Sequence, residues 1–141
     1  MKKIKHQQQP NYDTCTSACL AMILDLPVEQ VIKEFHEKWM NRESDPAQYL
    51  TEKGIEFELH RDPYDNCLAW GKLYLVTVAS INVQGQFHHV LVDLRGGEEN
   101  TVVYDPNEGK LDRAYYVWHS REKLEQYPLR AWCIDMSIEL G

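Results

Sequence analysis

The spacing of hydrophobic and polar positions divides the chain into a helical first part and a strand-rich second part. Residues 15–24 are almost all small or apolar, a composition that favours a helix. A second helix is expected over residues 27–40, where apolar side chains recur on one face and Pro27 suits the first helical position. The run Asp-Pro-Ala-Gln at residues 45–48 supplies a cap, a first-turn proline and a glutamine three residues after the cap. A third helix is therefore expected from there to Gly54, which ends it.

After residue 54 the pattern becomes that of strands. Residues 55–59 alternate apolar and charged side chains, as a half-buried strand does. Longer apolar runs and turn signals give the other expected elements: strands over residues 73–83, 87–95, 100–105, 113–118 and 130–139, and a short helix from Ser120. Helices followed by antiparallel strands are typical of an α+β fold, and we expect residues 1–141 to form a single domain.

The composition fits a single globular domain and argues against two classes of partner. Hydrophobic residues make up 43% of the 141 residues, enough for a core without disulfides or metals. The 22 acidic and 15 basic residues give a formal charge of −7, which argues against nucleic-acid binding. No apolar run approaches the roughly 18–20 residues of a membrane span, and the start of the chain lacks the apolar segment of a signal peptide. We therefore expect a cytoplasmic protein with no membrane or nucleic-acid partner, whose four cysteines are free thiols.

Among the cysteines, Cys15 has the position that best suits chemistry. Residues 6–14 contain proline, asparagine and aspartate and are expected to form an extended loop, so Cys15 lies where this loop becomes a helix. At the start of a helix, free backbone N–H groups and the helix dipole favour negative charge, and a nearby histidine lowers the pKa of a thiol further. Cys15 is therefore the candidate nucleophile, whereas Cys19, one turn further in, is expected in the core.

The adjacent His88 and His89 open an apolar strand, and a strand holds a side chain rigidly enough for a general base. A third group must orient the imidazole, and Asp105 lies on the next expected strand. A two-residue turn at residues 96–97 would set His88 opposite Asp105, where the two side chains can hydrogen-bond. A longer turn, which the Glu-Glu-Asn sequence at residues 98–100 allows, would change this register.

Acyl transfer also needs hydrogen-bond donors for the oxyanion that develops on the attacked carbonyl group. Gln9 lies six residues before Cys15, in the expected loop. A loop of this length can fold the Gln9 amide back toward the sulfur. Gln9 and the backbone N–H of Cys15 are therefore the candidate donors.

Three segments together resemble a known family. They are Gln9 followed after five residues by Thr-Cys-Thr-Ser-Ala-Cys-Leu-Ala-Met-Ile-Leu (residues 14–24), His-His-Val-Leu-Val-Asp (residues 88–93) and Val-Val-Tyr-Asp-Pro-Asn-Glu-Gly (residues 102–109). Their order and separation are similar to those of the bacteriocin-processing, or double-glycine, cysteine peptidases of the papain-like superfamily. The resemblance implies a papain-like fold, with N-terminal helices packed on an antiparallel β-sheet.

The resemblance also implies a role for each candidate residue. Cys15 would be the nucleophile, Gln9 the oxyanion donor and Asp105 the orienting acid. Alignment of the apolar strand without gaps favours His88 as the base. The family usually has glycine after its cysteine, whereas this chain has Thr16, whose Cβ is expected to narrow the approach of substrate.

The choice between the two histidines also determines which side chains of their strand point inward and which point outward. With His88 as the base, Val90 and Val92 are expected on the inner face, and His89 and Asp93 outside. His89 is the alternative base, but this choice turns the charged Asp93 inward, which costs more.

The predicted function is that of a cysteine-dependent amide hydrolase, a peptidase that acts on a peptide or protein substrate without a cofactor. Glutamine deamidation and acyl transfer occur on related folds and are alternatives. A metal site formed by Cys15, Cys19, His88 and His89 is a rival, but structural zinc cysteines usually flank a tight turn, whereas these lie on an expected helix. A non-catalytic peptide-binding module is a third possibility, although it would not need the whole Cys, His, Asp and Gln set.

Overall fold

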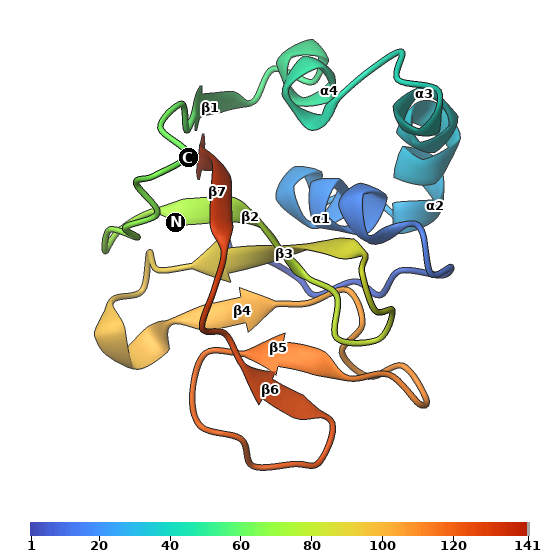
Figure 1. The fold of residues 1–141 in the computed structure, drawn as a ribbon. Coiled ribbons are helices and arrows are strands. Elements are labelled where there is room, and N and C mark those ends of the chain that lie inside the picture. The colour runs from blue at the N-terminus through green and yellow to red at the C-terminus, as the bar shows by residue number, and fades with distance from the viewer. Residues whose placement is uncertain (141) are drawn as a thin grey trace.

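The computed structural model describes residues 1–140, with helices in the first part of the chain and strands in the second (Figure 1). The helical elements are α1 (Cys15–Leu24), α2 (Val28–Val31), the π-helical η1 (Ile32–His36), α3 (Glu37–Met40) and α4 (Pro46–Glu52). The strands are β1 (Glu56–Leu59), β2 (Leu73–Ala79), β3 (Phe87–Asp93), β4 (Val102–Tyr104), β5 (Tyr115–Val117), β6 (Gln126–Pro128) and β7 (Cys133–Glu139). A short 3₁₀ helix, η2 (Glu98–Asn100), lies between β3 and β4. The fold is α+β, as predicted.

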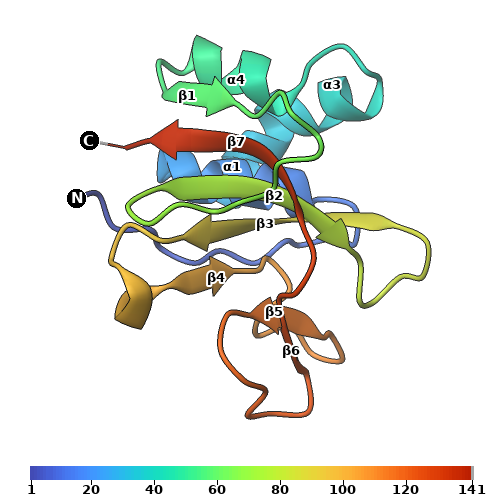
Figure 2. The same ribbon diagram turned by 60° about the vertical axis from the view of Figure 1, so that its left-hand side comes forward.

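Five of the strands form one antiparallel sheet in the order β1-β7-β2-β3-β4. β5 and β6 form a separate parallel pair beyond the β4 edge (Figure 1). α1 lies between the other helices and the sheet, as the two ribbon views show (Figure 2). The predicted packing of N-terminal helices on an antiparallel sheet is therefore confirmed, and it places the start of α1 next to β3.

The three predicted helical segments are all present. α1 has the bounds expected from the sequence. α4 begins as predicted, because the Asp45 carboxylate accepts a hydrogen bond from the Gln48 N–H at 2.8 Å and Pro46 is the first helical residue. The second segment differs in detail, because Pro27 is the N-cap rather than the first helical residue and a π-helical stretch interrupts the run.

Both faces of β3 are buried, which corrects the expected assignment of an inner and an outer face. Leu91 packs in the core cluster that includes α1. Val90 and Val92 pack on the opposite face, in a second cluster with aromatic side chains that follow β4 in the chain. Asp93 is only 8% exposed, and its carboxylate pairs with Arg95 at 2.9 Å, so this charge is accommodated inside. When both faces of a strand are covered, the sequence pattern does not say which face is which.

The connection between β3 and β4 is longer than a two-residue glycine turn, because it includes η2. The two strands pair with Leu91 opposite Tyr104. This register, continued by one residue, sets Asp105 opposite Val90 rather than opposite His88. The expected direct pairing is therefore wrong, but His88 and Asp105 become diagonal neighbours, a separation that long side chains can still bridge.

The predicted short helix from Ser120 is also wrong, because this segment is a loop that leads into β6. The side-chain oxygen of Gln126 accepts hydrogen bonds from the backbone N–H groups of Glu122 and Lys123, at 2.9 and 3.0 Å. A side chain that binds backbone groups in this way competes with helix formation. Leu124 is 82% exposed, so its side chain does not pack in the core and provides no tertiary contact that would stabilise a helix here.

In residues 1–140, none of the helices alone has the length and apolar composition needed to cross a membrane. α1 and the helical run Val28–Met40 meet these criteria only as a pair, and the chain bends by 117° between them.

Replacing Leu20 in α1 tests the packing that positions the start of this helix. Leu20 is 0% exposed, so Leu20→Ala is expected to lower the free energy of unfolding by about 2–5 kcal/mol, through lost burial and the cavity left behind. Leu111, at 89% exposed, is the matched control, and Leu111→Ala should change this free energy by less than about 0.5 kcal/mol. Urea unfolding of both variants measures the difference. Equal losses would contradict the described packing of α1.

Candidate active site

The N-terminal end of α1 presents the Cys15 sulfur beside backbone N–H groups that no side chain caps. Thr14 occupies the N-cap position, but its hydroxyl donates to the Asn11 carbonyl at 2.9 Å and accepts from the Asn11 N–H at 3.1 Å. The Thr14 side chain therefore stabilises the preceding turn and does not cap α1. The first turn of α1 also contains no acidic residue. The free N–H groups and the helix dipole consequently favour an anion at Cys15.

β3 and the loop after β4 supply a histidine and a carboxylate that meet beside this sulfur. His88 Nε2 lies 2.7 Å from Asp105 Oδ1, and the two side chains are 7% and 1% exposed. The Asp105 carboxylate also accepts hydrogen bonds from the backbone N–H groups of Asn107 and Tyr116, at 2.9 and 2.8 Å. Because Nε2 of His88 donates to Asp105, its other ring nitrogen, Nδ1, is left for the thiol.

Cys15 and His88 favour the thiolate–imidazolium pair over a broad pH range. Burial raises the pKa of Cys15, but the hydrogen bonds and charges of His88 and His89 outweigh burial and lower this pKa to about 5. Burial lowers the pKa of His88, but Asp105 and Cys15 outweigh it and raise this pKa to about 9. Between these two values both groups are charged, which is the reactive state of a thiol nucleophile.

His89 is a second histidine at the same sulfur. Its Nδ1 lies 2.7 Å from Thr16 Oγ1, and its Nε2 lies 3.3 Å from Asp135 Oδ2. The side chain is 15% exposed, so the expectation that it lies on an outer face is wrong. Sequence reasoning did not identify Asp135, although a carboxylate between Ile134 and Met136 in an otherwise apolar stretch was a usable signal.

Gln9 is buried in the loop before α1 but does not line the pocket at the sulfur. Its Nε2 donates to the Asn11 carbonyl at 2.8 Å, and its Oε1 has no hydrogen-bond partner among residues 1–140. Its backbone N–H donates to the Pro106 carbonyl at 3.0 Å, which ties this loop to the residue after Asp105. An amide nitrogen carries two hydrogens, so one remains for an oxyanion. The role of Gln9 as oxyanion donor stays a prediction.

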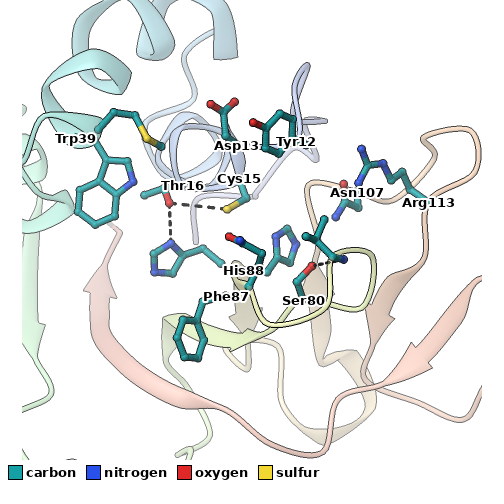
Figure 3. A pocket seen from close by; sticks show the side chains of 14 residues that line it. Tyr12, Asp13, Cys15, Thr16, Trp39, Ser80, Phe87, His88, Asn107 and Arg113 are labelled. Atoms are coloured by element: carbon teal, nitrogen blue, oxygen red, sulfur yellow. Dashed lines mark hydrogen bonds between the residues drawn. The ribbon is translucent and has the colours of Figure 1, made fainter.

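A pocket of about 260 Å³ opens onto the Cys15 sulfur (Figure 3). In this view Trp39 and Phe87 lie on one side of the sulfur, and Asn107 and Arg113 lie on the other. Asn107 is 4% exposed, and its Oδ1 has no hydrogen-bond partner among residues 1–140. A bound molecule therefore meets apolar surface on one side of the thiol and polar groups on the other.

Cys19 does not join Cys15, His88 and His89 as the rival metal site would require. Cys19 is 0% exposed, and its thiol donates to the backbone carbonyl of His89 at 3.4 Å. Burial, followed by the charge of Cys15, raises the pKa of Cys19, so this thiol does not become a thiolate ligand readily. In the part of the chain that the structure describes, no group of three or more His, Cys, Asp or Glu side chains is arranged to hold a metal ion.

The state of Cys15 can be tested with iodoacetamide, which reacts with the thiolate. The rate of alkylation is expected to reach half of its plateau near pH 5 and to fall below that pH, because protonation removes the thiolate. Mass spectrometry of the peptide that contains Cys15 measures the rate, and Cys15→Ser identifies the reacting residue. A half-maximal rate near the ordinary thiol pKa of about 8.5 would contradict the described contacts.

The sulfur of Cys15, the His88–Asp105 pair and the pocket come from separate parts of the chain and meet at one place. Side chains in such a site, more than the fold that carries them, determine what a protein does. Comparisons of the chain with protein-family models, with curated proteins and with solved structures find no match.

Proposed function

We propose that this protein is a cysteine-dependent amide hydrolase, a papain-like peptidase with Cys15 as nucleophile, His88 as base and Asp105 as orienting acid. The observation that carries this proposal is the buried His88–Asp105 pair, at 2.7 Å, beside a thiol whose pKa is lowered to about 5. Burying these charges costs free energy, and a cysteine that only packs in the core has no use for them. The three motifs that resemble the bacteriocin-processing peptidases support the same assignment.

In the proposed reaction, the Cys15 thiolate attacks the carbonyl carbon of the amide and forms a tetrahedral oxyanion. As the C–N bond breaks, His88 donates its Nδ1 proton to the leaving amine, and a thioester remains on Cys15. Neutral His88 then accepts a proton from water, whose oxygen attacks the thioester. Collapse of this second intermediate releases the carboxylic acid and restores the thiolate and the imidazolium. Asp105 keeps Nδ1 of His88 directed at the sulfur in each step.

Two donors are proposed for the oxyanion. The backbone N–H of Cys15 is at the start of α1, where N–H groups have no intrahelical partner. The second donor is the Nε2 of Gln9, whose position is held by the Asn11 and Pro106 carbonyl groups. Donors that are fixed before substrate binds stabilise developing charge without reorganisation.

The pocket favours a peptide or protein substrate with an apolar group next to the reacting amide. Phe87 is 81% exposed at the mouth of the pocket, and Trp39 lines the same side. Exposed aromatic side chains beside a nucleophile are suited to anchor an apolar group, and the polar groups on the other side can orient an amide. Deamidation of glutamine or acyl transfer would use the same first steps and differ in the leaving group or the acceptor.

The reaction can be identified by treating a mixture of cellular proteins with the active protein and with Cys15→Ala. Peptide hydrolysis should give new chain ends, deamidation a mass increase of one unit, and acyl transfer a larger added mass, and each should be absent with Cys15→Ala. Cys15→Ser should be nearly as inactive, because a serine hydroxyl is far less ionised. Mass spectrometry distinguishes the products. If the active protein only binds peptides and leaves all masses unchanged, it is a binding module and the proposal is wrong.

Gln9→Ala tests the oxyanion donor. Loss of one preorganised donor is expected to lower kcat by about 10²–10³ with little change in KM, because this donor acts mainly in the transition state. Gln8, an exposed neighbour in the same glutamine run, is the matched control, and Gln8→Ala should retain kcat. Steady-state kinetics of both folded variants decide the role. Equal kcat values would remove Gln9 from the mechanism.

A further inference from the structure

The Cys15 sulfur lies between two imidazole–carboxylate pairs, of which the proposed mechanism uses only one. On one side is His88 with Asp105, and on the other is His89 with Asp135. Burial raises the pKa of Cys15 and both imidazoles lower it, and the Thr16 hydroxyl lies between His89 and the sulfur. A single pair is enough for a base and its orienting acid, so the second pair calls for an explanation.

The two ring nitrogens of His89 are both engaged, unlike those of His88. Nε2 faces Asp135, and Nδ1 lies 2.7 Å from the hydroxyl of Thr16, whose oxygen is 3.9 Å from the Cys15 sulfur. The Asp135 carboxylate is itself held by the hydroxyl of Thr77, which donates to Oδ2 at 2.7 Å. His89 is therefore fixed from both ends and has no free nitrogen to give to a leaving group.

The hydroxyl of Thr16 connects the protonation of His89 to that of Cys15. When His89 is neutral, the Thr16 hydroxyl donates to Nδ1. Two proton transfers can then occur together. The proton of the Cys15 thiol passes to Thr16 Oγ1, and the proton that Thr16 already carried passes to Nδ1 of His89. The products are a Cys15 thiolate and a His89 imidazolium, and Thr16 is again a neutral hydroxyl. The new hydroxyl hydrogen then faces the sulfur. Thr16, which stands where the bacteriocin-processing peptidases usually have glycine, thus bridges the Cys15 sulfur and the imidazole of His89.

The groups around His89 favour its charged form. Burial lowers the pKa of His89, but the hydrogen bonds and charges of Asp135, which faces it from β7, and of Cys15 outweigh burial and raise this pKa to about 9. The Cys19 thiol contacts only the backbone carbonyl of His89, and burial keeps this thiol neutral. The pair with Asp135 is longer and more exposed than the pair of His88, at 3.3 Å and with the carboxylate 36% exposed, so water weakens it more.

We propose that His89, held by Asp135 and joined to Cys15 through Thr16, is a positioning residue that keeps the Cys15 sulfur ionised independently of His88. This role rests on Cys15 being the nucleophile of the proposed function. During the reaction His88 gives its proton away, and a site with a single imidazole then loses its positive charge. With His89 still charged, the sulfur regains its thiolate form when the thioester is hydrolysed.

The test is the pH dependence of Cys15 alkylation by iodoacetamide in His88→Gln, His89→Gln and the double variant, followed by mass spectrometry. The midpoint is the pH at which the alkylation rate reaches half of its plateau. The midpoint of each single variant is expected to lie between that of the unmodified protein and that of the double variant. Each shift should be about one pH unit or more, which is a tenfold loss of thiolate at a fixed pH below the midpoint. Only the double variant should have its midpoint in the ordinary thiol range near pH 8.5 or above it, because burial then raises the pKa of Cys15 with no imidazolium to oppose it.

Three further variants separate positioning from a structural role. Thr16→Val preserves the shape of the side chain and removes only the hydroxyl bridge, so it should shift the midpoint in the same direction as His89→Gln, and it replaces that variant if His89→Gln does not fold. Asp135→Asn should also raise the midpoint. His36 is the matched control, because its Nε2 pairs with Asp13 at 3.4 Å but it does not act on the sulfur. His36→Gln should leave the midpoint unchanged.

The proposal is overturned if His88→Gln alone gives the midpoint of the double variant, or if His89→Gln and Thr16→Val both leave the midpoint where it was. These measurements need no substrate. If the midpoints behave as expected and no amide is hydrolysed, the second pair stands and the proposed hydrolase fails. If amides are hydrolysed and the midpoint depends on His88 alone, the proposed hydrolase stands and the role of the His89–Asp135 pair fails.

Discussion

A carboxylate that is 1% exposed, such as that of Asp105, stays ionised only if nearby groups replace the water that it loses. The imidazole of His88 and two backbone N–H groups do so, and the backbone carbonyl of Asp105 contacts the His6 ring at 2.7 Å. The partners of the carboxylate come from β3, from the loop after β4 and from β5. The need to solvate one charge therefore sets where these three segments of the chain meet.

The charges at the sulfur alternate in sign, which lowers the cost of burying them. A thiolate lies between two imidazolium groups, and each imidazolium is followed by a carboxylate. Each charge thus has at least one neighbour of opposite sign, and the helix dipole of α1 adds to the positive field at the sulfur. Removing one imidazole leaves its carboxylate without that counter-charge, whereas the sulfur keeps the other imidazole.

The sequence predicted what depends on local chemistry and missed what depends on distant segments. The cap at Asp45 and the helix that starts at Cys15 follow from neighbouring residues, and both are present. The meeting of His88 with Asp105 was expected, but the register that leads to it was not, because η2 lengthens the turn. The position of His89 was missed because both faces of β3 are covered, and its partner lies on the last strand.

The order of the site's residues along the chain has a consequence for a newly made molecule. The proposed nucleophile is near the start, at residue 15, whereas the carboxylates that pair with the two histidines are at residues 105 and 135. During synthesis Cys15 leaves the ribosome long before these partners, so the emerging polypeptide carries an ordinary, unactivated thiol. Both imidazole–carboxylate pairs are therefore complete only when the final strand, β7, joins the sheet.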